Sequence, residues 1–219
     1  MVCGLFGKLA AKRDFVALSV PREFLRVWEP WIDEGMATGR KRFQPGEWEQ
    51  AFLSAPIWRF WLGSSLCGDA FTGALMPSVD ALGRLFPLTL TLKQGDGERF
   101  ESPDVDSRDD WFERVEEFLL ATLDPRTPFE TTLSRLADLP SAPGDPETSA
   151  ENHASAIFAA LRREHRDLPV SAATFWWTMG GSNCAPLATL QRSMPPPRAF
   201  ADMLTTGLAH PPRAEARLN

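Results

Sequence analysis

The chain contains 219 residues, of which 43% are hydrophobic and 24% are charged, a composition typical of one globular domain. A chain of this length buries about 70% of the surface of its unfolded state, so we expect it to need neither a disulfide nor a structural metal. There are 23 Lys and Arg against 29 Asp and Glu, giving a net charge of −6. This balance argues against nucleic acid as the main partner, because phosphate binding requires concentrated positive charge.

The cysteines and the start of the chain both bear on the compartment. Cys3, Cys67 and Cys184 are widely spaced and form no C-x-x-C pair, which predicts neither a disulfide framework nor a zinc site. The first residues place their apolar stretch before their charges, the reverse of a secretory signal. We therefore expect a cytoplasmic protein.

The N-terminal part of the chain alternates between a strand and helices. Residues 2–6 form a short apolar run that suits a first strand. A helix is predicted over residues 21–42, because Pro21 opens a run in which apolar residues recur at spacings of three and four. The basic cluster at residues 40–42 is interpreted as the end of this helix, where positive charge meets exposed carbonyl groups, rather than as a binding patch. A shorter helix is predicted over residues 47–54.

Extended segments come next. Residues 57–62, 70–76 and 85–92 are apolar runs of strand length separated by short turn-forming segments. Consecutive strands with short connections are antiparallel neighbours, so these three are expected to pair in that way. Residues 94–110 are rich in acidic side chains and are predicted to form a solvated loop.

The remaining chain is mainly helical. Helices are predicted over residues 111–123, 127–136, 150–163 and 197–208, with a surface connection over residues 141–149. Residues 209–219 are expected to be a disordered tail, so one domain covers residues 1–208. Strands interleaved with helices that cover both faces of a sheet predict an α/β fold, a three-layer α-β-α sandwich with a mixed, partly antiparallel sheet.

One uncharged segment, residues 168–191, is long enough to cross a membrane about 30 Å thick. Turn-forming residues such as Pro169 and Gly180 interrupt it, and its aromatic and β-branched residues favour strands. The segment therefore predicts two buried strands joined by a turn, with no membrane insertion.

Common catalytic and metal-binding motifs are missing. Lys8 follows two glycines, but Leu9 stands where a phosphate-binding loop requires Ser or Thr. Residues 180–182 lack the G-x-S-x-G pattern of an exposed nucleophile and favour a turn between strands. The three histidines have no partner three or four residues away, so no metal site is predicted.

A set of polar residues lies within apolar surroundings and is the candidate site: Asp14, Arg59, Ser78, Asp80 and Arg84. Arg59 interrupts a strand of apolar residues, where an unpaired guanidinium is costly. We expect it to meet a carboxylate such as Asp80 or Asp14. The set is either a structural ion pair or a site that recognises a ligand or partner, and the residues leave both open.

Aromatic composition is unusual, with 8 Trp, 15 Phe and no Tyr. Trp is favoured among the buried anchors of protein interfaces, so its excess is compatible with a binding protein. Neighbouring residues on a strand point to opposite faces, so only one of Trp176 and Trp177 is expected to face the core. Trp48, Trp61 and the other member of that pair are expected to be exposed.

Short segments along the chain carry a family resemblance. They lie at residues 4–9, 14–16, 21–24, 55–60, 76–80, 83–84, 86–88 and 176–178. Their order and spacing resemble the TagF/ImpM family, accessory proteins of type VI secretion, and the resemblance spans residues 4 to about 208.

This resemblance implies regulation without catalysis. Members of the family act as cytoplasmic, post-translational repressors that bind the forkhead-associated scaffold protein of the secretion machine, and no cofactor accompanies them. The resemblance implies no catalytic residues and makes the matched positions candidates for a partner-binding face only: Trp58, Arg59, Ser78, Asp80, Arg84, Trp176 and Trp177.

Two alternatives remain open. The first is an enzyme of the threonine-phosphorylation pathway that controls secretion, with Asp14 and Asp80 as acids and Arg59 and Arg84 gripping a phosphate. The chain offers no grouped carboxylates of the kind that hold two ions in a metal-dependent phosphatase. The second is an adaptor or chaperone for secreted substrates, which composition does not separate from a repressor.

Overall fold

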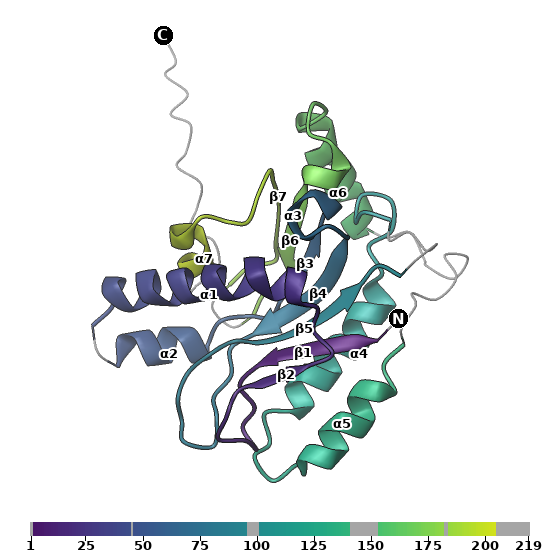
Figure 1. The fold of residues 1–219 in the computed structure, drawn as a ribbon. Helices are drawn as coiled ribbons and strands as arrows, with labels where there is room; N and C mark the ends of the chain where they lie inside the picture. The colour runs from purple at the N-terminus through teal and green to yellow at the C-terminus, as the bar shows by residue number, and fades with distance from the viewer. Residues whose placement is uncertain (1, 45, 96–100, 141–152, 182–183, 205–219) are drawn as a thin grey trace.

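A computed structural model describes residues 2–44, 46–95, 101–140, 153–181 and 184–204. The described chain forms one sheet with helices packed on both of its faces (Figure 1). The strands are β1 (Cys3–Gly7), β2 (Val16–Leu18), β3 (Trp58–Leu62), β4 (Phe71–Met76), β5 (Leu88–Lys93), β6 (Thr174–Thr178) and β7 (Leu187–Gln191). The helices are α1 (Arg22–Arg42), α2 (Glu47–Leu53), α3 (Ser64–Cys67), α4 (Asp109–Ala121), α5 (Phe129–Ala137), α6 (His153–Glu164) and α7 (Pro197–Met203), with a 3₁₀ turn, η2, at Val170–Ala172.

The sheet has the strand order β2-β1-β5-β4-β3-β6-β7, and every neighbouring pair is antiparallel. The prediction of a mixed sheet was therefore wrong. Parallel neighbours arise when a helix connects two adjacent strands. Here the long helical connections link strands that are not adjacent: α1 and α2 run from β2 to β3, and α4 to α6 run from β5 to β6. The four-residue helix α3 joins the neighbours β3 and β4, but it is too short to cross over to the parallel direction. The prediction of an α/β fold is confirmed.

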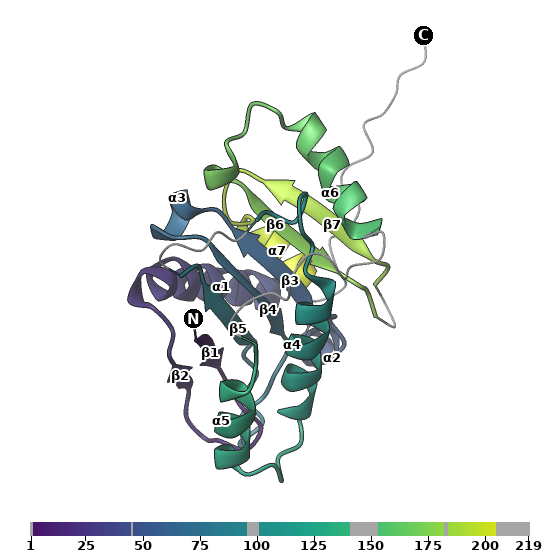
Figure 2. The same ribbon diagram turned by 90° about the vertical axis from the view of Figure 1, so that its right-hand side faces the viewer.

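The side chains of each strand point alternately to the two faces of the sheet and belong to two separate hydrophobic cores. One face of the sheet packs against α4, α5 and α6, and the other packs against α1, α2 and α7 (Figures 1 and 2). Trp61 and Trp177 belong to the first core, while Trp58, Phe60 and Trp176 belong to the second. Because both faces are covered, every residue of β3 and β6 is buried rather than alternate ones.

Helix α1 confirms the helix predicted over residues 21–42 and shows what attaches it to the sheet. Its apolar stripe is buried, and the indole Nε1–H of Trp28 donates a hydrogen bond to Thr89 Oγ1 on β5 at 3.0 Å. The basic residues 40–42 form its last turn, as predicted. One of them, Arg42, pairs with Asp202 of α7, so the end of α1 is held against the C-terminal helix.

Several predictions about solvent exposure were wrong, above all those for the tryptophans. Trp61 and both members of the pair Trp176 and Trp177 are buried, because neither face of the sheet is left to solvent. Trp48, on α2, is buried where that helix packs against Gly39 of α1. Segment 94–110 is also not simply a solvated loop, since Ser102 and Ser107 are buried and α4 already begins at Asp109.

Some predictions lie outside the described residues. These are the connection at residues 141–149 and the tail at residues 209–219. The long uncharged segment, residues 168–191, contains the whole of β6 and the whole of β7. The prediction of two strands there is confirmed. Within the described residues, no helix combines the length and apolarity that a membrane crossing requires.

Candidate functional site

The predicted site residues fall into three separate places. Ser78, Asp80 and Arg84 lie in the loop between β4 and β5, near the loop that follows β1 and carries Asp14 (Figure 1). Arg59 lies in the middle of the sheet beneath α4. The three tryptophans lie within the two cores. The single polar set of the sequence prediction is therefore not one cluster.

Asp80 is the centre of the first group, and its side chain is fully buried. Its Oδ2 atom lies 2.9 Å from Lys8 Nζ and accepts a hydrogen bond from Arg84 Nε at 2.6 Å. Its Oδ1 atom accepts hydrogen bonds from the backbone N–H groups of Leu82 and Arg84, both at 2.9 Å. A short loop of this kind is stabilised when an acidic side chain binds backbone N–H groups a few residues further on.

The charge on Asp80 is stabilised by these partners. Burial acts to raise the pKa of this carboxyl, but hydrogen bonds from the Arg84 backbone, from Lys8, from the Arg84 guanidinium and from the Leu82 backbone outweigh it. Together they hold the pKa of Asp80 well below its ordinary value. The group is therefore a fixed anion at neutral pH rather than a general acid.

Further bonds join this loop to the segment after β1. Ser78 Oγ donates to the backbone oxygen of Lys8 at 2.8 Å, and the Ala81 N–H donates to the backbone oxygen of Lys12 at 2.8 Å. The Arg84 guanidinium donates to the backbone oxygen of Arg13. Ser78 is thus a structural residue that joins two loops at one end of the sheet.

Three exposed side chains lie over this buried support. Phe15 is 53% exposed and Leu82 is 59% exposed, while the Arg84 side chain is 56% exposed. Lys8 Nζ lies 5.2 Å from the centre of the Phe15 ring, so the same ammonium contacts Phe15 and Asp80. We call Phe15, Leu82 and Arg84, with the buried residues Asp80 and Lys8 that hold them, the Asp80 surface.

Phe15 is held in place although half of it faces solvent. Its ring meets Phe86 edge to face, with 4.7 Å between the ring centres, and a third ring, that of Phe6, lies 6.3 Å away. Asp14, its neighbour, is exposed and makes no ion pair among the described residues. The Asp80 surface therefore combines exposed apolar area with a guanidinium whose position is determined by a buried carboxylate.

Arg59 does not meet Asp80 or Asp14, so the partners expected from the sequence were wrong. Its Nε donates to Glu116 Oε1 at 2.6 Å and its Nη1 donates to Asp109 Oδ1 at 3.0 Å. Both carboxylates belong to α4, and the guanidinium also lies 5.1 Å from the centre of the Phe112 ring on the same helix. Arg59 joins β3 to α4, which agrees with the structural interpretation.

The tryptophans among the predicted site residues are buried. Trp58 Nε1–H donates to the backbone oxygen of Met203 at 2.8 Å, and Trp176 Nε1–H donates to Thr174 Oγ1 at 3.0 Å. Trp177 packs on the opposite face of the sheet, with its ring centre 4.9 Å from that of Phe112. The structure thus places these three residues where they support the fold.

Sequence reasoning missed several residues of these two groups. Lys8 was considered only as part of a phosphate-binding loop, although a lysine that follows a buried strand signals a buried carboxylate partner. Leu82 carries no sequence signal, because its exposure follows from the loop geometry. Glu116 and Asp109 lie 57 and 50 residues from Arg59, so no local pattern identifies them.

Metal binding finds no support in the part of the chain that the structure describes. No group of three or more His, Cys, Asp or Glu side chains is placed there to hold an ion. What the Asp80 surface can do chemically is recognise another molecule through apolar contact and through a charge-assisted hydrogen bond from Arg84.

Comparison with known proteins gives a family match and similarity to solved structures. Residues 4–139 match the family described as the TagF N-terminal domain, type VI secretion system-associated. The whole chain is similar to PA0076 of Pseudomonas aeruginosa PAO1, a crystal structure, with 31% sequence identity and a TM-score of 0.72. That similarity covers 95% of this chain and 97% of the other. No curated protein sequence matches the chain.

Proposed function

The chain belongs to the TagF N-terminal domain family of type VI secretion-associated proteins, and from that premise we propose that it represses this secretion in the cytoplasm by binding the forkhead-associated scaffold protein. It acts by occupying a surface of the scaffold and catalyses no reaction. The resemblance of the sequence to TagF/ImpM proteins supports the kind of partner. The Asp80 surface supports the mode of action.

The observation that carries the proposal is the exposure of Phe15, Leu82 and Arg84 above a fully buried carboxylate. Aromatic residues and arginine are the side chains most enriched among the anchors of protein interfaces. An arginine held by a buried anion loses little conformational freedom on binding, which reduces the entropy cost of association. All the residues of the Asp80 surface also lie within the segment that matches the family.

The tryptophans do not form the proposed binding face. All eight are buried, and five of them donate a hydrogen bond through Nε1–H, while the other three contact aromatic rings. Their number reflects the covering of both faces of one sheet. The proposed binding face therefore uses Phe15 rather than a tryptophan as its aromatic residue.

The positions of the two arginines do not support the alternative of a phosphoryl-transfer enzyme. That alternative requires Arg59 and Arg84 to grip one phosphate, but they bind different carboxylates on different elements. Asp80 is also already paired with Lys8 and Arg84, which leaves it no role as a proton donor or base near neutral pH.

Calorimetric titration of the purified protein with the scaffold protein tests the proposal. We expect saturable binding by the native chain and at least tenfold weaker binding by the variants Arg84→Ala and Leu82→Ser. Arg126→Ala is the matched control, because Arg126 also pairs with a nearby aspartate but is 89% exposed on another loop. Absence of binding by the native protein contradicts the proposal.

A phosphatase assay on phosphothreonine peptides, run with the same preparations, separates a binding protein from an enzyme. We expect no release of phosphate above the rate without protein. Turnover that is lost in Arg84→Ala and retained in Arg126→Ala overturns the proposal in favour of the enzyme.

A further inference from the structure

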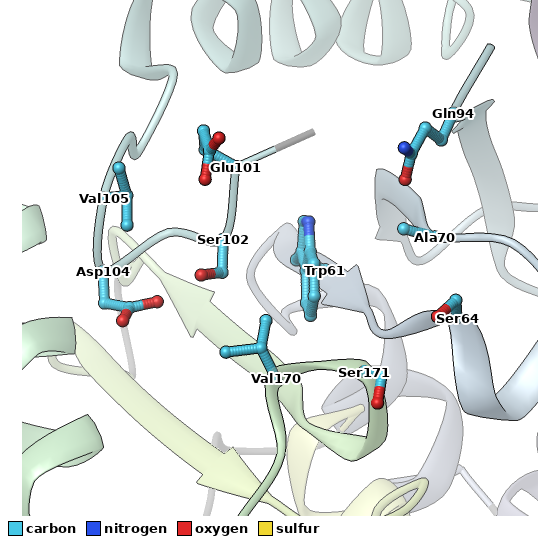
Figure 3. Close-up of a pocket in the computed structure, with 10 residues that line it drawn as sticks. All are labelled: Trp61, Ser64, Ala70, Gln94, Glu101, Ser102, Asp104, Val105, Val170 and Ser171. Atoms are coloured by element: carbon cyan, nitrogen blue, oxygen red, sulfur yellow. The ribbon is translucent and has the colours of Figure 1, made fainter. Parts of the chain in front are cut away.

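A pocket of about 470 Å³ opens at the other end of the strands, away from the candidate site. Figure 3 shows Trp61, from the end of β3, at its centre, with Gln94 from the end of β5 and Val170 from η2 around it. A third wall is residues 101–105, the segment that precedes α4. The volume lies within the range of small-molecule sites.

Trp61 provides an unused hydrogen-bond donor in this pocket. The residue is only 4% exposed, and its Nε1–H finds no hydrogen-bond partner among the residues that the structure describes. In Figure 3 the indole nitrogen is on the side of the ring nearer to Glu101 and Gln94. A buried N–H group without a partner is costly, and the great majority of such groups in native proteins are bonded to protein, water or ligand.

The same pocket contains a hydrogen-bond acceptor and negative charge. Asp104 Oδ1 is buried and has no hydrogen-bond partner in the described part of the chain, while Oδ2 of the same carboxylate lies 3.6 Å from Arg162 Nε. Glu101 adds a second carboxylate. Among the described residues that line the pocket there is no lysine and no arginine. The lining therefore presents negative charge together with one indole N–H donor.

We infer that this pocket binds a ligand with an ammonium or guanidinium group and, on the same molecule, a carbonyl or carboxylate oxygen. The cationic group pairs with Asp104 Oδ1 and Glu101, and the oxygen accepts the hydrogen bond of Trp61 Nε1. This chemistry belongs both to free basic amino acids and to a lysine or arginine of another protein. The site is independent of the Asp80 surface and goes beyond the proposed function.

The expected affinity is modest. Glu101 also interacts electrostatically with Arg108, and Asp104 with Arg162, so the ligand shares its carboxylates with arginines of the protein. A dozen-atom ligand under these conditions has a dissociation constant of about 0.1–1 mM.

Calorimetry with four probes tests the inference. L-arginine carries both required groups, agmatine has the positive charge without the oxygen, and N-acetylargininamide mimics arginine within a peptide. N-acetylcitrullinamide has the shape of N-acetylargininamide but carries no positive charge. We expect L-arginine or N-acetylargininamide to bind about 3- to 10-fold more tightly than agmatine, the value of one hydrogen bond. Tighter binding of the free amino acid indicates a metabolite, and tighter binding of the capped one indicates a partner side chain.

Two variants locate the binding. Trp61→Phe keeps an aromatic ring but removes the N–H, so it should abolish the preference for the oxygen-bearing probes. Glu101→Gln should weaken every cationic probe and leave the melting temperature unchanged, which keeps the test valid if Trp61→Phe is unstable. Binding of N-acetylcitrullinamide as tightly as N-acetylargininamide, no saturable binding of any probe, or unchanged binding by Glu101→Gln overturns the inference.

Discussion

Arg59 Nε and Glu116 Oε1 lie 2.6 Å apart and join strand β3, in the interior of the sheet, to helix α4. The arginine side chain is almost fully buried, while Glu116 and Asp109, its second partner, keep 22% and 28% of their side chains exposed. This ion pair places a charge inside a core that is otherwise apolar on the same face of the sheet. The main role of this ion pair is structural, because it fixes the position of α4 on the sheet.

Replacing Arg59 by alanine should destabilise the protein by about 3 kcal/mol. That is the lower end of the 3–5 kcal/mol typical for a broken buried pair, because both carboxylates left behind have access to water. Urea unfolding measures the difference, and Arg126→Ala should change the free energy of unfolding by no more than about 0.5 kcal/mol. A stable Arg59→Ala protein that no longer binds the scaffold would make Arg59 a contact residue instead.

The buried carboxylate of Asp80 should make stability depend on pH in the acid range. Its pKa in the folded protein is below the ordinary value of about 4, so its stabilising effect is fully present above that pH and is lost as the pH falls further. Asp80→Asn should therefore be less stable than the native protein at pH 7. The difference should shrink below about pH 4, as followed by thermal unfolding from pH 7 to pH 2.

Asp14→Asn serves as the matched control for that pH series, since Asp14 is exposed and belongs to the same loop region. Its unfolding curve should track that of the native protein at every pH. A difference between Asp80→Asn and the native protein that stays constant from pH 7 to pH 2 would contradict the role given to the Asp80 charge.

Arg84→Ala should separate binding from stability. The Arg84 side chain is more than half exposed, so its pair with Asp80 contributes no more than about 1 kcal/mol to the free energy of unfolding. Loss of scaffold binding with a melting temperature close to that of the native protein is the expected result. A variant that is much less stable would mean that Arg84 holds the loop and does not contact the partner.

Gly35 on α1 should not tolerate a side chain. A Cβ atom there would lie 1.5 Å from the Phe200 ring of α7, so Gly35→Ala forces the two helices apart and should cost about 1–3 kcal/mol. Glu34→Ala, at an exposed position of the same helix, is the control. The double variant Gly35→Ala with Phe200→Leu should recover part of the loss, and failure to recover any would point to a different cause.

Much of the secondary structure could be predicted because each element carries its own period. The apolar stripe of α1 and the aromatic run of β6 specify a helix and a strand from adjacent residues alone. Predictions about exposure failed although helices on both faces were expected, because which helix covers which side chain is decided only by tertiary packing: Trp61 is buried because α4 and its neighbours cover it. The short elements β2 and α3 carry too few residues for a period to be recognised.

The candidate site shows the same division. Arg59, Ser78, Asp80 and Arg84 stand out because polar groups in apolar surroundings require partners, and that requirement is a property of the sequence alone. Which partners they find was decided only by the tertiary structure. The sequence brings Asp80 within four residues of Arg84, but only the pairing of strands brings it to Lys8, and only the packing of α4 supplies Arg59 with Glu116 and Asp109. The physical reason is that local patterns act over a few residues, whereas ion pairs between elements depend on which faces are packed together.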